Sequence, residues 1–257
     1  MPDETVIPLP HTSTGAGNPP IVLLHGFGGD RRAWDLIAGP LGSYREVLAF
    51  DLPGHGKAAR WTPIPDVPAA AKAVLQSLDA MNVAKASFVG HSMGGAVAAL
   101  VGIFAPERLE HLVLLAPGGF APDVNVPLLK RYAAATDQQA LQEILVGFCG
   151  PSSTVPGALA EAIAEARQDN TVRDAHAAIV HRITEGDGQG TLPLKVLAAA
   201  PFPTTLIWGE EDAITPLRHA LDAPAPFARH ILKGKGHMLP QEAPEAVVRT
   251  VKEALEL

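Results

Sequence analysis

The sequence lacks several features, and each absence excludes a class of protein. Its 257 residues include one cysteine, Cys149, which cannot form a disulfide within the chain and which we interpret as a small buried hydrophobe. Disulfides are rare in a reducing cytoplasm, so a cytoplasmic location is expected. The acidic start, Met-Pro-Asp-Glu, has neither the basic nor the apolar region of a signal peptide. The apolar runs fall short of the roughly 20 residues that span a membrane, so no membrane partner is expected.

Charge and metal-ligand patterns exclude further partners. The net charge is −7, and the 20 lysines and arginines form no basic stripe, which argues against nucleic-acid binding. No cluster of metal-ligand residues is apparent, and we expect neither a metal nor a cofactor. The sequence indicates no oligomeric state. Its length and its 47% hydrophobic content suit one large α/β domain that carries an insertion.

A short glycine-rich stretch carries the first chemical signal. It matches the pattern G-x-S-x-G with Gly90-His91-Ser92-Met93-Gly94. Residues 86–89 before it are apolar and predict a buried strand, and the Ala-rich residues 96–101 after it predict a buried helix. A strand that turns abruptly into a helix leaves no room for side chains, which explains the glycines. The helix start brings free N–H groups beside the serine, so Ser92 is the candidate nucleophile.

A serine nucleophile needs a base, and the base needs an orienting acid. Two later strand-like segments offer both at their C-terminal ends, where open α/β sheets place their sites. Residues 204–208 lead into an acidic loop that contains Glu211 and Asp212, and residues 229–232 lead to His237. The chain order serine, acid, histidine is that of nucleophile-elbow enzymes. The residues alone leave Glu211 open as a rival to Asp212.

Taken together, these motifs resemble the α/β-hydrolase superfamily of serine hydrolases. The resemblance implies an α/β fold, a mostly parallel twisted sheet flanked by helices. It implies Ser92 as nucleophile, His237 as base and Asp212 as acid, because the family spacing is Gly-x-x-Asp. It also implies that the backbone N–H groups of Phe27 and Met93 form the oxyanion hole.

Other polar residues in these motifs have structural interpretations. His25 precedes the oxyanion loop and is interpreted as a residue that ties this loop, because the mechanism already has its base. Asp51 and His55 lie in a loop typical of the family near the mouth of the site, and we do not expect them to act in catalysis. Some relatives keep their acid after the strand predicted at residues 109–115. None stands there in this chain, which favours Asp212.

The middle of the chain, residues 120–200, breaks the alternation of strands and helices. A capping box with Thr136 as N-cap predicts a helix with an apolar stripe. Two more helices are predicted at residues 158–167 and 171–184, the second capped by Asn170. By resemblance these helices form a lid, residues 120–200, inserted into a core. That core comprises residues 1–119 and 201–257. We expect four residues to line a substrate pocket, namely Leu129, Leu145, Phe148 and Met238.

The leading functional hypothesis is a serine hydrolase that cleaves a carboxylic ester or a similar small acyl substrate through an acyl-enzyme. The motifs most resemble the hydrolase module that is fused to lipoyl domains in acetoin dehydrogenase acetyltransferases. The sequence has no lipoyl or linker segment, so the resemblance is restricted to the module. Acyl transfer would use the same residues, as would carbon–carbon bond hydrolysis in meta-cleavage product hydrolases. Those relatives usually carry an aromatic where Met238 and Leu239 stand, which disfavours this alternative. A non-catalytic ligand-binding protein of the same fold is the remaining alternative.

Overall fold

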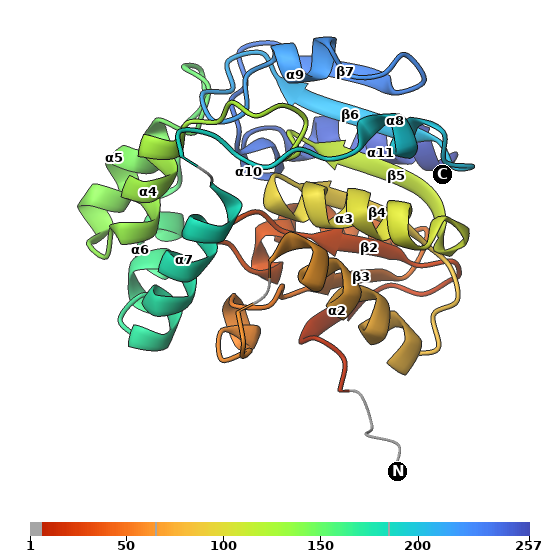
Figure 1. The fold of residues 1–257 in the computed structure, drawn as a ribbon, viewed down its shortest axis with the longest axis horizontal. Helices are drawn as coiled ribbons and strands as arrows, with labels where there is room; N and C mark the ends of the chain where they lie inside the picture. Colours follow the sequence, from red (N-terminus) through yellow and green to blue (C-terminus); the bar gives the residue numbers. More distant parts are fainter. Residues whose placement is uncertain (1–6, 65, 185) are drawn as a thin grey trace.

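The computed structural model describes residues 7–64, 66–184 and 186–257. A seven-stranded sheet with the order β1-β3-β2-β4-β5-β6-β7 forms its centre (Figure 1). All neighbouring strands are parallel except β1 and β3, which pair antiparallel. The predicted α/β class and the mostly parallel sheet are confirmed. The strands are β1 (His11–Thr14), β2 (Ile21–Leu24), β3 (Val47–Phe50), β4 (Ala86–His91), β5 (Leu109–Leu115), β6 (Thr204–Gly209) and β7 (Ala228–Leu232).

Helices cover both faces of this sheet, which explains why its central strands are continuous apolar runs. On one face α2 (Val67–Ala80), α3 (Met93–Phe104) and α8 (Leu194–Ala198) pack together, and on the other α1 (Asp35–Gly42) packs against α11 (Pro244–Leu255). Shorter helical segments connect these elements. They are η1 (Arg31–Trp34), η2 (Gly56–Ala58), η3 (Pro106–Arg108), α9 (Arg218–Leu221) and α10 (Leu239–Glu242).

Between β5 and β6 the chain leaves the sheet and forms a group of helices at one end of it, coloured green to teal in Figure 1. The group consists of α4 (Val126–Ala134), α5 (Gln138–Val146), α6 (Gly157–Ala166) and α7 (Asn170–Ile183). We refer to α4–α7 as the lid helices, because the sequence predicts a lid there. Helix α8 also falls within residues 120–200, but it packs against α3 on the sheet. None of the helices in the described residues is both long and apolar enough to span a membrane.

The starts of the lid helices differ from the sequence predictions. The N-cap of α5 is Asp137 rather than Thr136, because the Asp137 carboxylate accepts from the N–H of Ala140 at 2.9 Å. The N-cap of α7 is Asp169 rather than Asn170, since its carboxylate accepts from the N–H of Thr171. An aspartate adjacent to the predicted cap supplies the oxygen in both cases. Helix α4 was not predicted.

Candidate active site

Ser92 lies at a sharp turn between β4 and α3. Its backbone angles are φ 52° and ψ −117°, in a region that residues other than glycine rarely adopt. A Cβ atom on Gly90 would meet the backbone of Gly94, and one on Gly94 would meet the carbonyl oxygens of Leu24 and His25. The turn therefore needs glycine at both ends of the G-x-S-x-G pattern. Strain of this kind concentrates at functional sites.

Three residues predicted from separate motifs form one chain of hydrogen bonds. The Oγ atom of Ser92 lies 2.9 Å from Nε2 of His237, and Nδ1 of His237 lies 2.8 Å from Oδ2 of Asp212. His237 is 2% exposed and Asp212 is 8% exposed. The rival acid, Glu211, is exposed and takes no part in these bonds. We refer to Ser92, His237 and Asp212 as the relay.

The Asp212 carboxylate is fixed by the loop that follows it. Its Oδ1 atom accepts from the N–H groups of Ile214 and Thr215, at 2.8 and 2.9 Å. Its Oδ2 atom accepts from the hydroxyl of Thr215 at 3.0 Å, in addition to its bond with His237. Thr215 was not recognised in the sequence as a site residue. An aspartate that bonds main-chain N–H groups two and three residues later is a common turn, so the signal was present in the spacing.

The loop that carries His237 is held from two sides. The N–H of His237 donates to the carbonyl oxygen of Phe148 at 2.7 Å, and the ring of Phe148 lies edge-on to the His237 ring. The carbonyl oxygen of His237 lies 2.8 Å from Nε2 of His91. Burial, with a smaller contribution from the neighbouring His237, lowers the pKa of His91 to about 3. His91 is therefore neutral near pH 7 and its Nε2–H can donate to this carbonyl.

The N–H groups of Phe27 and Met93 have the surroundings expected of an oxyanion hole. Met93 is the first residue of α3, where an N–H has no acceptor within the helix. Among the hydrogen bonds of the described residues, neither N–H is used. The loop that holds Phe27 passes close to the nucleophile, because a Cβ atom on Gly26 would lie 3.2 Å from Cβ of Ser92.

Buried histidines support the loop that holds Phe27. His25 donates from Nδ1 to the carbonyl oxygen of Gly26 and accepts at Nε2 from the N–H of Leu52, which is a structural arrangement. His55 accepts at Nε2 from the N–H of Gly28 at 3.0 Å. Burial lowers the pKa of both histidines. The nearby His25 lowers the pKa of His55 further.

Two other polar residues of this region also have structural surroundings. Asp51 accepts from the N–H groups of Arg31 and Lys57 and pairs with the Arg31 guanidinium. His176 of α7 stacks against Phe27, with ring centroids 5.6 Å apart. Its pKa is lowered to about 3, first by burial and then by Arg167. Burial raises the pKa of Cys149 to about 12, so this half-buried thiol is a poor nucleophile at neutral pH.

A cavity of about 300 Å³ lies at Ser92. Phe27, Met93 and Thr215 line it close to the relay, and Leu129 of the lid helices also lines it. Leu145, Phe148 and Met238 are not among the described residues that line it. Leu145 is fully buried where α5 packs on its neighbouring helices, and Phe148 stacks on Tyr132. Met238 is half-buried and is the N-cap of α10.

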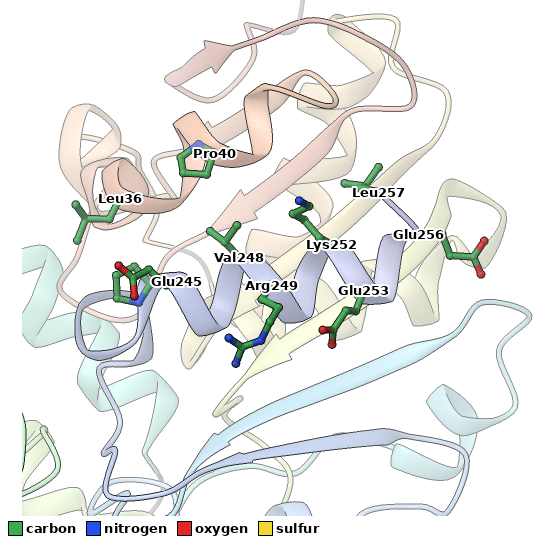
Figure 2. Close-up of a pocket in the computed structure, with 10 residues that line it drawn as sticks. Leu36, Pro40, Glu245, Val248, Arg249, Lys252, Glu253, Glu256 and Leu257 are labelled. Atoms are coloured by element: carbon green, nitrogen blue, oxygen red, sulfur yellow. The ribbon is translucent and has the colours of Figure 1, made fainter.

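A second hollow, of about 730 Å³, lies on the surface between α1 and α11 (Figure 2). Leu36 and Pro40 border it from α1, and Val248 and Lys252 border it from α11. It is larger than the cavity at Ser92, but no member of the relay lines it. The smaller cavity is therefore the candidate substrate site. Over residues 7–64, 66–184 and 186–257, no three histidine, cysteine, aspartate or glutamate side chains are grouped to hold a metal ion.

The chain is similar in sequence to known proteins. The chain is 35% identical over 233 residues to the dihydrolipoyllysine-residue acetyltransferase component of the acetoin cleaving system of Pseudomonas putida. The aligned region covers 91% of this chain and 62% of that protein. The chain thus spans less than two thirds of that relative. It is 26% identical over 253 residues to esterase YbfF of Escherichia coli, with 93% of each chain covered.

Solved structures show the same fold. A meta-cleavage product hydrolase of Pseudomonas fluorescens (CumD) superposes with a TM-score of 0.86 at 23% identity, covering 96% of this chain and 93% of that one. The model of the Alpha/beta hydrolase family matches residues 21–250. The resemblance drawn from the motifs is confirmed: this protein belongs to the alpha/beta hydrolase family.

Proposed function

We propose that this protein is a serine hydrolase that cleaves a carboxylic ester or a similar small acyl compound. The observation that carries the proposal is the relay of Ser92, His237 and Asp212, with both hydrogen bonds within 2.9 Å, at the wall of a cavity. Nucleophile, base and acid at these separations constitute the arrangement that activates a serine hydroxyl. Membership of the family and the similarity to an esterase support the same reaction.

In the proposed mechanism, Oγ of Ser92 attacks the substrate carbonyl carbon while Nε2 of His237 takes the hydroxyl proton. Asp212 holds the imidazole with Nδ1–H toward its carboxylate and stabilises the imidazolium that forms. The N–H groups of Phe27 and Met93 bind the oxyanion of the tetrahedral intermediate. His237 then gives its proton to the leaving alcohol. Water, activated by His237, hydrolyses the acyl-enzyme and restores the serine.

The test is the loss of both activity and covalent labelling in Ser92→Ala. Hydrolysis of p-nitrophenyl esters should fall by several orders of magnitude, because the relay acts as a unit. A fluorophosphonate probe should label the wild type and not the variant. Ser43→Ala is the matched control, since Ser43 is exposed at the end of α1. Retention of more than about a tenth of the activity in Ser92→Ala would refute the assignment. A wild type that the probe does not label would favour the non-catalytic alternative.

Acyl transfer is a second candidate, because the 35% identical relative is named as an acetyltransferase component. The same acyl-enzyme would form, and a thiol would replace water in the second step. The two candidates differ in their product. Incubating the enzyme with an activated acetyl ester and dihydrolipoamide should give acetate for a hydrolase and a thioester for a transferase, and mass spectrometry distinguishes them.

A further inference from the structure

One face of α3 forms the floor of the cavity at Ser92. Met93, Ala96 and Leu100 all line the cavity, and their spacings of three and four residues put them on the same side of the helix. At a rise of 1.5 Å per residue, this floor runs for roughly 10 Å from the nucleophile toward the far end of α3. The floor is apolar along its whole length.

The walls of the cavity are mostly apolar, with Gln189, Thr191 and Thr215 as uncharged polar residues, and its charges are confined to the rim. Val67 begins α2 on one side, and Leu192 follows the lid helices on the other. The charged residues that line the cavity are Asp66 and Arg182, and both side chains are exposed. A charged group on the substrate would therefore find no buried partner among the described residues of the floor and walls.

The floor carries a small side chain close to Ser92. Ala96 lies between Met93 and Leu100 on the floor, four residues after Ser92. Gly118 borders the cavity beside it, because a Cβ atom on Gly118 would lie 3.3 Å from Oε1 of Gln189 and 3.9 Å from Cβ of Ala96. A larger side chain at position 96 would therefore occupy part of the cavity near Ser92. The volume of about 300 Å³ is at the small end of the range for ligand cavities.

Building on the proposed ester hydrolysis, we propose that this cavity binds a single unbranched, uncharged alkyl chain of the substrate, roughly six to eight carbons long over the ~10 Å floor. Ala96 determines specificity because its small side chain leaves room in the cavity near Ser92. Leu100 sets the length that fits, because it lies at the far end of the floor. The alkyl chain can belong to the acyl or to the alcohol part of the ester, and the experiment separates the two.

The experiment measures kcat/KM for two series of esters. In p-nitrophenyl alkanoates the acyl chain grows from two to twelve carbons, and in alkyl acetates the alcohol grows over the same range. In one series kcat/KM should rise by up to about fourfold per methylene and stop rising at roughly six to eight carbons. Ala96→Leu should move this optimum at least two carbons shorter. Leu100→Ala should move it at least two carbons longer.

Ala69→Leu is the matched control, because Ala69 is exposed on α2 and does not line the cavity. It should leave the length profile unchanged, and melting temperatures should show that each variant is folded. The inference would be overturned if kcat/KM did not change with chain length in either series. It would also be overturned if the two cavity variants lowered kcat/KM equally for all chain lengths or left the length profile unchanged. These outcomes differ from failure of the proposed function, in which no ester is hydrolysed and the fluorophosphonate does not label Ser92.

Discussion

Nε2 of His91 lies 2.8 Å from the backbone carbonyl oxygen of His237, so the residue before Ser92 holds the loop that carries His237. The other ring nitrogen of His91 faces the loop that holds Gly26 and Phe27, because a Cβ atom on Gly26 would lie 2.9 Å from Nδ1. His91 thus contacts two loops, those of His237 and Gly26, whose positions relative to Ser92 matter for the proposed reaction. With a pKa of about 3, it keeps its neutral form over the pH range in which most hydrolases are assayed.

This contact gives the first prediction. His91→Ala should lower kcat by about 10- to 100-fold with little change in KM, because misplacing a catalytic group by an ångström costs rate rather than binding. His91→Gln should recover part of the loss, since its amide can donate to the same carbonyl. Steady-state kinetics on a p-nitrophenyl ester measures both constants. A rise in KM at constant kcat, or no difference between the two variants, would contradict a positioning role.

The second prediction concerns the acid. Asp212→Asn should leave the loop intact but favour the wrong tautomer of His237, with a loss of kcat of up to ~10⁴-fold by analogy with serine proteases. Glu211→Gln is the control, and it should have little effect because Glu211 is exposed and outside the relay. The two variants should be assayed side by side. The reverse ranking would assign the acid to Glu211.

The third prediction separates packing from substrate binding in the lid. Phe148 is 4% exposed and packs against the rings of Tyr132 and His237. Phe148→Ala should therefore lower the free energy of unfolding by about 3–5 kcal/mol and leave the preferred chain length unchanged. Leu129→Ala is the contrasting variant, since Leu129 lines the cavity and should change that preference. Urea denaturation and the ester series measure the two effects. A changed preference in a stable Phe148→Ala protein would place this ring in the substrate site.

The fourth prediction concerns acid stability. Burial lowers the pKa of five histidines in the folded protein, namely His25, His55, His91, His111 and His176. In the unfolded chain they protonate near pH 6.5, so the unfolded state binds more protons below that pH. The free energy of unfolding should therefore be constant above about pH 7 and decline below about pH 6.5, by up to about 1.4 kcal/mol per pH unit for each histidine.

Urea denaturation at pH 7.5, 6.0 and 5.0 measures this decline. His176→Phe removes one of the five groups and keeps an aromatic ring against Phe27. Its stability should fall less steeply with acidification than that of the wild type. Equal slopes in the two proteins would mean that His176 is protonated in the folded state.

The sheet and the relay could be predicted because their signals are local. Buried parallel strands are short apolar runs, and those at β4, β5 and β6 were recognised with boundaries close to those observed. Ser92, Asp212 and His237 each follow the end of a strand, and the family spacing selected Asp212 over Glu211. The topology then brings these distant residues together without further information from the sequence.

The cavity and the lid details could not be predicted, because they depend on how distant segments dock. Helix α4 has nine residues with Pro127 in its first turn, so its buried residues Val126, Leu129, Tyr132 and Ala133 give only a short apolar pattern. Phe148 continues the stripe of α5 but lies beyond its end, and its ring contacts the loop of His237. The residues 189–193 line the cavity from a loop that has no periodic pattern.

The lid helices leave the sheet after β5 and the chain returns in β6, and these two strands are paired neighbours. The ends of the inserted segment are therefore anchored side by side by the hydrogen bonds of the sheet. Doubling the length of a segment closed in this way adds only about 0.6 kcal/mol of closure entropy. During evolution, insertions and deletions in this segment can reshape the substrate range at little cost to folding, while Ser92, Asp212 and His237 keep their places at the strand ends.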